Sequence, residues 1–412
     1  MSALAALKNT VFVLVVCLLA CRSSSEGNSP SRTGVDHAPA TPLRIAANRT
    51  EIYFPLLEGK DFALVANQTS VVFTPERAGG GWVHLADSLL GAGLSLKKVF
   101  APEHGFRGLA DAGEKVQDGR DPATGLPVIS LYGKYRKPGA DQLGGLDLVV
   151  FDIQDVGVRF YTYIATLQLV MEACAEAGIP VLVLDRPNPN AHYVDGPVME
   201  PEHRSFLGMT EIPLVYGMTM GEYARMINEE GWLEGGLKAD LTVVPLLGYD
   251  REVPYELPIA PSPNLPNTHA ARWYPSLGLF EGTHINAGRG TRRQFQSFGA
   301  PFLLPQHFDY TYIPEPMPGA SQPKHQGQTC YGRDLSGVTP PDAVDLQWLL
   351  EAYAYREKGS EFFNPGGFTR HAGTAALQKQ IEAGWDADQI RAGWQEGLEA
   401  FKNIRKGYLL YD

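Results

Sequence analysis

The segment 97–108 (KKVFAPEHGFRG) places an acid, an imidazole and a guanidinium directly after a short apolar run. Pro102 ends that run, and the two glycines of the segment allow the backbone to approach a ligand closely. Open α/β sheets bind their ligands beyond the carboxyl ends of the strands. We therefore interpret Glu103, His104 and Arg107 as parts of a site that follows a buried strand.

Three more polar residues follow apolar runs in the same way, namely Asn67, Asp152 and Asp185. If the strands are parallel, these side chains and Glu103 meet at one edge of the sheet. Each residue alone is equally consistent with a solvated turn or a helix cap. The set of four favours a site.

Two further segments carry groups suited to binding sugars. Residues 152–163 (DIQDVGVRFYTY) add Asp155, Arg159, Tyr161 and Tyr163 where a strand passes into a helix. Carboxylates bind sugar hydroxyls while aromatic faces stack on sugar C–H surfaces, although the aromatics are as easily explained as helix core.

Residues 280–291 (FEGTHINAGRGT) repeat the combination, with Glu281 and Arg289 in a loop that contains glycines. No Gly-Lys-Ser/Thr phosphate loop follows, and the pair Gly91 and Gly93 lacks the third glycine of a dinucleotide fingerprint. We expect no cofactor, and a metal held by Asp152, Asp155 and a histidine stays open without being required.

The apolar runs and helical periods must position these groups. Strands are predicted at 62–66, 99–101, 128–131, 146–153, 181–184 and 241–244. A helix is predicted at 161–177, ended by Gly178, and another begins at a capping box from Thr219 to Glu222. This alternation predicts an α/β fold, with a mainly parallel sheet and helices on both faces.

Prolines crowd the chain after residue 253, and the alternation of strands and helices stops there. We therefore predict a first domain at 44–253 and a smaller α+β domain at 254–412. Helices in the second domain are expected near 342–356 and 371–383.

The N-terminus has the pattern of an export signal. Lys8 precedes an apolar run at 11–20 that is too short to span a bilayer. The run ends in Leu-Leu-Ala-Cys, which resembles a bacterial lipobox with Cys21 as the lipidated residue. We predict a signal peptide at 1–20 and a flexible tether at 21–43. A plain secretory signal with a chance cysteine is the alternative. The expected location is extracytoplasmic and lipid-anchored, at the periplasmic face or the outer membrane of a bacterium.

The net charge of the 412 residues is -11 and basic residues form no runs, which argues against a nucleic-acid partner. Any contact with a membrane is expected through the lipid alone. Cys174 and Cys330 have no CxxC partner, and we interpret them as buried structural thiols, although a disulfide between them stays open.

Several motifs in order carry a family resemblance. Together they resemble the NamZ-type exo-β-N-acetylmuramidases, long known only as a domain of unknown function. The motifs are 102–108, 152–163, 184–189 (LDRPNP), 262–266 (SPNLP) and 280–291. The resemblance implies a Rossmann-like N-terminal domain and a glycoside hydrolase. Such an enzyme removes N-acetylmuramic acid from the non-reducing ends of peptidoglycan fragments.

Glycoside hydrolysis usually needs a carboxylic acid and a second group that acts as base or nucleophile. Under this resemblance Glu103 is the candidate acid, and Glu281, Asp152 or Asp155 is the second group. A guanidinium at Arg107 would lower the pKa of a nearby carboxyl, which weakens the acid role unless Arg107 points at substrate. The lactyl carboxylate of muramic acid needs a cation, for which Arg107, Arg159 and Arg289 are candidates. The other expected substrate-binding residues are Asn67, His104, Tyr161, Tyr163, Asp185 and Asn264.

Two other functions fit the same residues. One is a metal-dependent esterase or phosphoesterase with its metal at Asp152 and Asp155. The other is a lipoprotein that binds cell-wall glycan without catalysis.

Overall fold

The computed structural model describes residues 41–74, 81–107 and 118–411. They belong to one compact unit. The predicted signal peptide, Cys21 and most of the predicted tether lie outside the described residues. Within the described ranges, no helix has the length and apolar character needed to cross a membrane.

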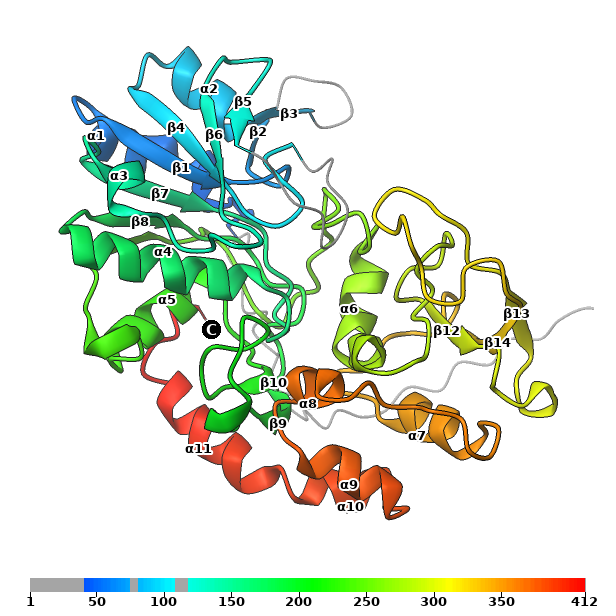
Figure 1. Ribbon diagram of the computed structural model, residues 1–412. Helices are drawn as coiled ribbons and strands as arrows, with labels where there is room; N and C mark the ends of the chain where they lie inside the picture. Colours follow the sequence, from blue (N-terminus) through cyan, green and yellow to red (C-terminus); the bar gives the residue numbers. More distant parts are fainter. Residues whose placement is uncertain (1–40, 75–80, 108–117, 412) are drawn as a thin grey trace, which may run out of the picture. The chain divides into compact units, whose positions relative to one another are not determined.

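A seven-stranded sheet forms the centre of the fold, in the order β11-β8-β7-β1-β4-β6-β5 (Figure 1). All neighbouring pairs are parallel except β5 and β6. The predicted α/β fold with a mainly parallel sheet is confirmed. Its strands are β1 (Phe62–Ala66), β4 (Leu96–Ala101), β5 (Gly119–Arg120), β6 (Pro127–Ser130), β7 (Leu148–Asp152), β8 (Val181–Leu184) and β11 (Leu241–Val244).

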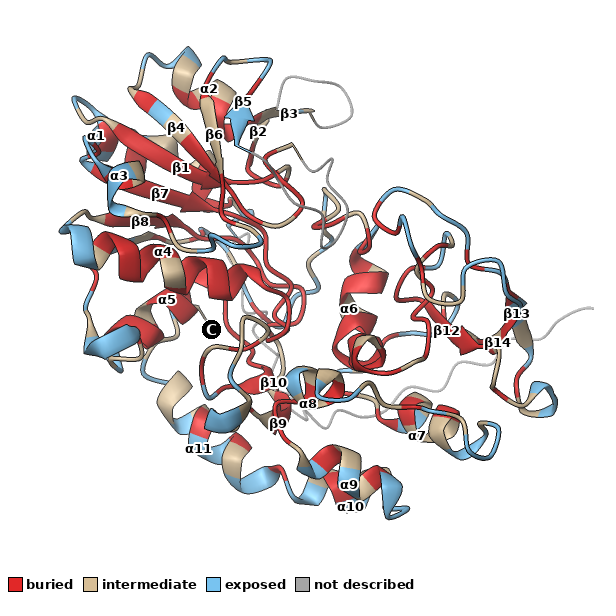
Figure 2. Cartoon of the chain, in the orientation of Figure 1, coloured by how far each residue is buried: buried red, intermediate tan, exposed pale blue. Residues whose placement is uncertain are grey.

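Helices cover both faces of this sheet, which explains why β1 and β7 are buried along their whole length (Figure 2). Alternate residues of β1 point to opposite faces. Ala63 and Val65 join the core that contains Leu167 of α4. Leu64 joins the core that contains Leu57 of α1. The helices of this part are α1 (Thr50–Leu57), α2 (Leu85–Gly91), α3 (Ala140–Leu143), α4 (Tyr163–Ala177) and α5 (Met220–Glu229).

Two predicted helix boundaries are confirmed. Helix α4 ends at Gly178, whose φ of 67° lies in the left-handed region that favours glycine. Helix α5 begins at the predicted capping box, in which Thr219 and Glu222 each accept a hydrogen bond from the other's backbone N–H. Two small antiparallel pairs lie outside the main sheet, β2 (Val71–Thr74) with β3 (Gly81–His84) and β9 (Asp195–Val198) with β10 (Pro213–Val215).

The C-terminal part is smaller and contains an antiparallel sheet in the order β12-β14-β13. The predicted domain boundary near residue 253 stays a prediction. The elements of this part are α6 (Thr268–Leu277), β12 (Ser297–Ala300), β13 (Tyr310–Tyr312), β14 (Cys330–Asp334), α7 (Gln347–Ala354), α8 (Gly367–Ala372), α9 (Ala376–Glu382), α10 (Ala387–Ala392) and α11 (Gln395–Arg405).

The helix predicted near 371–383 is present as α9, but it begins only at Ala376, and residues 371–372 belong to α8. Gly373 has a φ of 79°, which ends α8 and separates it from α9. The chain then returns to the N-terminal part, where α11 lies beside β9 (Figure 1). Near the C-terminus, the Tyr411 hydroxyl donates to Asp185 at 2.6 Å. Cys174 and Cys330 are buried free thiols, as predicted.

A buried ion pair joins the ends of two central strands. The Arg186 guanidinium donates to both oxygens of Asp152, at 2.5 and 2.8 Å, and both side chains are almost fully buried. The same guanidinium donates to the carbonyl of Val71. This pair therefore ties the loop after β8 to the end of β7 and to β2.

We expect Asp152→Asn to lower the free energy of unfolding by about 3–5 kcal/mol, because it leaves the Arg186 charge buried without its counter-ion. Urea denaturation measures this loss. The matched control is Glu229→Gln, which breaks an exposed ion pair with Lys238 and should change stability by less than about 1 kcal/mol. Equal stability of Asp152→Asn and wild type would contradict this role.

Candidate active site

The carboxyl edge of the parallel sheet gathers the four residues that follow strands. Asn67, Glu103, Asp152 and Asp185 lie at the ends of β1, β4, β7 and β8, which are neighbours in the sheet. Only Glu103 of these four lines the pocket at this edge. The other three bind protein groups that fold the edge itself.

The pocket has a volume of about 370 Å³ and brings Glu103 of the N-terminal part together with Glu281 of the C-terminal part. Of the residues predicted from sequence, it also contains His104, Tyr161, Asn264 and Arg289. The remaining lining residues are Phe160, Thr162, Leu207, Ser262, Leu265, Tyr274, Phe295 and His371.

Glu103 is positioned by a tight turn after β4. Its Oε2 accepts a hydrogen bond of 3.0 Å from the Thr162 hydroxyl, which lies just before α4. His104 has a φ of 71°, and Gly105 continues the turn with a φ of 76°. Left-handed backbone at a non-glycine residue carries strain, which is concentrated at functional sites. His104 is buried and lines the pocket beside Glu103.

Glu281 lies in the 3₁₀ turn η4 (Gly278–Gly282), directly after α6. Its Oε1 pairs with Arg289 at 3.3 Å, and its Oε2 accepts a 3.3 Å hydrogen bond from Tyr274. A side chain at Gly278 would lie 2.4 Å from the Phe160 ring, and one at Gly282 would lie 2.5 Å from the backbone of α8. Glycine at both positions therefore allows the turn to pack against both sides of the pocket.

The Tyr274 phenol is close to both carboxylates. Burial raises the pKa of Tyr274 well above its usual range, and the charges of Glu281 and Glu103 raise this pKa further. Tyr274 therefore stays protonated at neutral pH and can donate to Glu281. Its ring also packs edge-to-face against Phe160 and Phe295, with centroids at 5.0 and 4.7 Å, which gives the pocket an aromatic wall.

Asp155 and Asp185 do not line the pocket. Asp155 accepts hydrogen bonds from the Tyr216 hydroxyl and the Gly157 amide, and burial raises its pKa to about 6. Asp185 accepts from Thr219 and from the amide of Gly221 at the start of α5. Burial raises the pKa of Asp185 to about 6 as well. Both carboxylates stabilise loops at the sheet edge.

Asn67 and Tyr163 are also outside the pocket lining. The side-chain oxygen of Asn67 accepts from the amide and the hydroxyl of Thr69, which closes a turn after β1. Tyr163 packs against Tyr161 with ring centroids 4.8 Å apart and supports the wall from behind. Its hydroxyl lies 3.5 Å from the carbonyl oxygen of Glu103.

Two of the three arginines predicted to bind the lactyl carboxylate instead bind protein groups outside the pocket. Arg107 donates to Asp121 and Asp87, and it does not line the pocket. Arg159 is fully buried and donates to four backbone carbonyls, those of Pro197, Ile212, His371 and Ala372. Its guanidinium ties β9 and the segment before β10 to the end of α8. Arg289 is the predicted clamp that the structure places in the pocket.

Tyr274, Phe295 and His371 line the pocket but were not predicted from the sequence. Tyr274 lies on α6 and His371 on α8, and no local motif marks either residue. Phe295 has a φ of 49°, which a sequence does not reveal. These residues reach the pocket through the packing of the C-terminal part.

The structure gives little support for a metal at Asp152 and Asp155. Both oxygens of Asp152 are occupied by Arg186, which a metal would have to displace. Among the described residues, the one group of three or more ligand side chains within 4.8 Å of one another comprises Glu200, Glu202 and His203. This group lies outside the pocket of Glu103 and Glu281.

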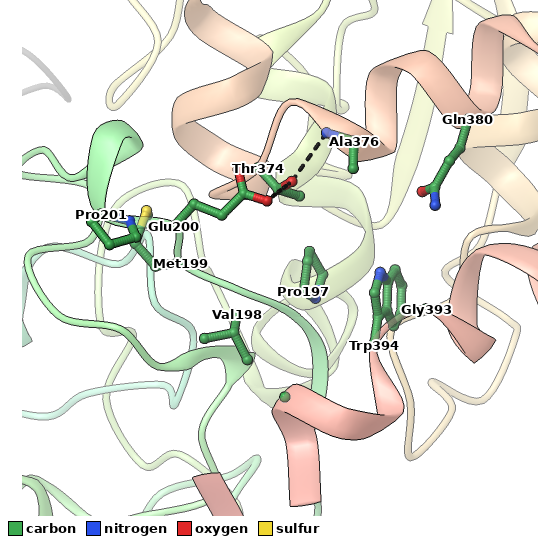
Figure 3. A pocket seen from close by; sticks show the side chains of 11 residues that line it. Pro197, Val198, Met199, Glu200, Pro201, Thr374, Ala376, Gln380, Gly393 and Trp394 are labelled. Carbon is green, nitrogen blue, oxygen red and sulfur yellow. Dashed lines mark hydrogen bonds between the residues drawn. The ribbon is translucent and has the colours of Figure 1, made fainter. Parts of the chain in front are cut away.

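A second pocket, of about 290 Å³, lies between β9 and the helices α9 and α11 (Figure 3). Trp394 and Gln380 line it, and Glu200 is its single carboxylate. The Thr374 hydroxyl donates to Glu200 at 2.6 Å. This pocket lacks the second carboxylate that acid–base hydrolysis requires. The pocket of Glu103 and Glu281 has two carboxylates and lies at the carboxyl edge of the parallel sheet, and it is therefore the candidate active site.

Two carboxylates facing an aromatic-walled pocket are typical of glycoside hydrolases. Comparison with known proteins agrees with this class. Residues 62–269 match the family described as "Exo-beta-N-acetylmuramidase NamZ, N-terminal", and residues 272–411 match its C-terminal counterpart. This chain belongs to the NamZ family.

Individual relatives extend over most of the chain. The peptidoglycan β-N-acetylmuramidase NamZ of Bacillus subtilis is 40% identical over 337 residues, which are 77% of this chain and 80% of the relative. The crystal structure of a DUF1343 family protein from Bacteroides fragilis is similar with a TM-score of 0.81 and 40% identity. A second DUF1343 protein of that organism has a TM-score of 0.74 and 28% identity. Each alignment covers 90% of this chain and 99% of the solved chain.

Proposed function

We propose that this chain is an exo-β-N-acetylmuramidase that hydrolyses the glycosidic bond of N-acetylmuramic acid at the non-reducing ends of peptidoglycan fragments. The observation that carries the proposal is the meeting of Glu103 and Glu281 in one pocket. They come from distant parts of the sequence, and the family assignment names the same reaction.

The surroundings of the two carboxylates suit different roles. Glu281 forms an ion pair with Arg289 and accepts from Tyr274, which fits a group that acts as a carboxylate, either base or nucleophile. Glu103 accepts from the Thr162 hydroxyl and is assigned the acid that protonates the leaving oxygen. Arg107, which the sequence places close to Glu103, does not line the pocket, because its guanidinium forms ion pairs with Asp87 and Asp121.

The other lining residues match the chemistry of muramic acid. Arg289 supplies a cation for the lactyl carboxylate, and Asn264 supplies an amide for sugar hydroxyls or the acetamido group. Both side chains are oriented by the carbonyl of Gly319, to which Arg289 donates at 3.1 Å and Asn264 at 2.7 Å. Tyr161 and Phe160 offer apolar surface to the sugar ring.

We expect Glu103→Gln and Glu281→Gln each to lower turnover of a chromogenic N-acetylmuramide by about 10²–10⁴-fold, because each removes one proton-transferring or nucleophilic group. Binding of N-acetylmuramic acid, measured by calorimetry, should persist. Glu200→Gln is the control, since Glu200 lines the other pocket. Full turnover by either active-site variant would remove that residue from the mechanism. A wild type that binds the sugar but releases none would favour a non-catalytic binding protein.

We also propose that lipid on Cys21 holds the enzyme outside the cytoplasm, where peptidoglycan lies. The support is the lipobox-like sequence that ends at Cys21. Cys21→Ser should abolish incorporation of labelled palmitate and move the protein from the membrane to the soluble fraction. Unchanged fractionation and labelling would contradict the anchor.

A further inference from the structure

The segment 280–285 carries Glu281, and the side chain of one lysine binds it along most of its length. Lys324 enters from a distant loop and is half-buried. Its Nζ lies within hydrogen-bond distance of four backbone carbonyls of this segment, those of Phe280 at 3.0 Å, Glu281 at 3.2 Å, Thr283 at 2.5 Å and Ile285 at 3.2 Å. The three N–H groups of the ammonium serve all four acceptors, so one N–H is shared between two carbonyls.

Two further residues complete the binding of this segment. The Nε2–H of His325 donates to the carbonyl of His284 at 2.6 Å. Asn364 donates through its amide side chain to the carbonyl of Thr283, and through its backbone N–H to that of Gly282. Each carbonyl from residue 280 to 285 therefore has a partner outside the segment, and Lys324 supplies most of them.

Lys324 is itself held in place. The side chain of Asn286 donates to the Lys324 carbonyl at 2.9 Å. The next residue, His325, has a φ of 59°, which is a strained backbone conformation for a residue other than glycine. With this backbone, the side chains of both Lys324 and His325 contact the segment 280–285. Such strain persists only when surrounding contacts enforce it, so this arrangement is specified and not incidental.

We propose that Lys324 is a positioning residue of the hydrolase, whose ammonium group fixes the turn that holds Glu281 in the pocket. The proposal rests on the function assigned above to Glu281. Lys324 does not line the pocket of Glu103 and Glu281, but it lines an adjoining pocket of about 230 Å³ with Glu281 and Arg289. We assign its effect on the reaction to its contacts with the backbone that carries Glu281.

The charge of Lys324 matters because an ammonium has three N–H donors and a neutral amine has two and a lone pair. Burial lowers the pKa of Lys324 to about 8, the negative charge of Glu281 opposes this shift, and Arg289 adds to it. His325 and His371 also interact electrostatically with Lys324, and the His284 side chain belongs to the segment that Lys324 binds. Lys324 is therefore protonated below about pH 8, and the binding of the segment weakens as the pH rises through that value.

Lys324→Met tests this role, because methionine keeps the apolar stem and removes the donors. We expect kcat on the chromogenic muramide to fall about 10- to 100-fold, the cost of a catalytic group displaced by about 1 Å, with KM changed less than about threefold. Lys98→Met is the matched control: Lys98 also donates to one backbone carbonyl, that of Gln142, but lies away from the pocket. Its kcat should equal that of wild type.

Lys324→Arg separates positioning from general structural loss. A guanidinium stays protonated at every accessible pH, so this variant should retain part of the turnover and lose the decline of kcat above about pH 8. Hydrogen–deuterium exchange of residues 280–285 gives a readout independent of turnover, and it should rise in Lys324→Met and not in Lys98→Met.

Three results would overturn the proposal. They are a wild-type kcat in Lys324→Met, an alkaline limb of Lys324→Arg identical to that of wild type, or unchanged exchange of residues 280–285 in Lys324→Met. If Lys324→Met does not fold, the pH profile of Lys324→Arg decides. Absence of turnover in the wild type would instead refute the proposed function, and the exchange measurement would still judge Lys324.

Discussion

The active-site pocket depends on one packing constraint, the close contact of the turn η4 with the end of the parallel sheet. Gly278 lies against Phe160 and Gly282 lies against α8, at distances that leave no room for a Cβ. This contact lets the turn approach the edge where β4 delivers Glu103, and Lys324 holds the backbone of the turn that carries Glu281. A larger residue at either glycine would move one carboxylate relative to the other.

The polar residues at the carboxyl edge of the sheet have two separate roles. Buried carboxylates stabilise the loops of this edge, and Glu103 lines the pocket. Asp152 binds Arg186, and Asp185 binds the start of α5 together with Tyr411 near the C-terminus. These groups hold the loops that surround the pocket without entering it. The edge is thus stabilised by its own polar residues, while Glu103 lines the pocket from the same row of strand ends.

Because polar residues at strand ends have both a structural and a pocket-lining role, the sequence could predict only part of the site. Strand positions and the shared edge follow from apolar runs and parallel pairing, and Glu103 and Glu281 follow from acids placed near glycines. The same rules could not separate Glu103 from Asp152 or Asp185, because every one of them follows a strand. The separation depends on distant partners such as Arg186, Tyr216 and Tyr411. Arg159 shows the same limit, since its four carbonyl acceptors come from three different segments.

The most direct test of this account is a crystal structure of the Glu103→Gln variant with bound N-acetylmuramic acid. We predict the sugar ring between residue 103 and Glu281, with its lactyl carboxylate at Arg289 and its apolar face toward the aromatic wall. Sugar bound instead in the pocket lined by Trp394 and Glu200, with the pocket of Glu281 empty, would contradict the assignment of the active site.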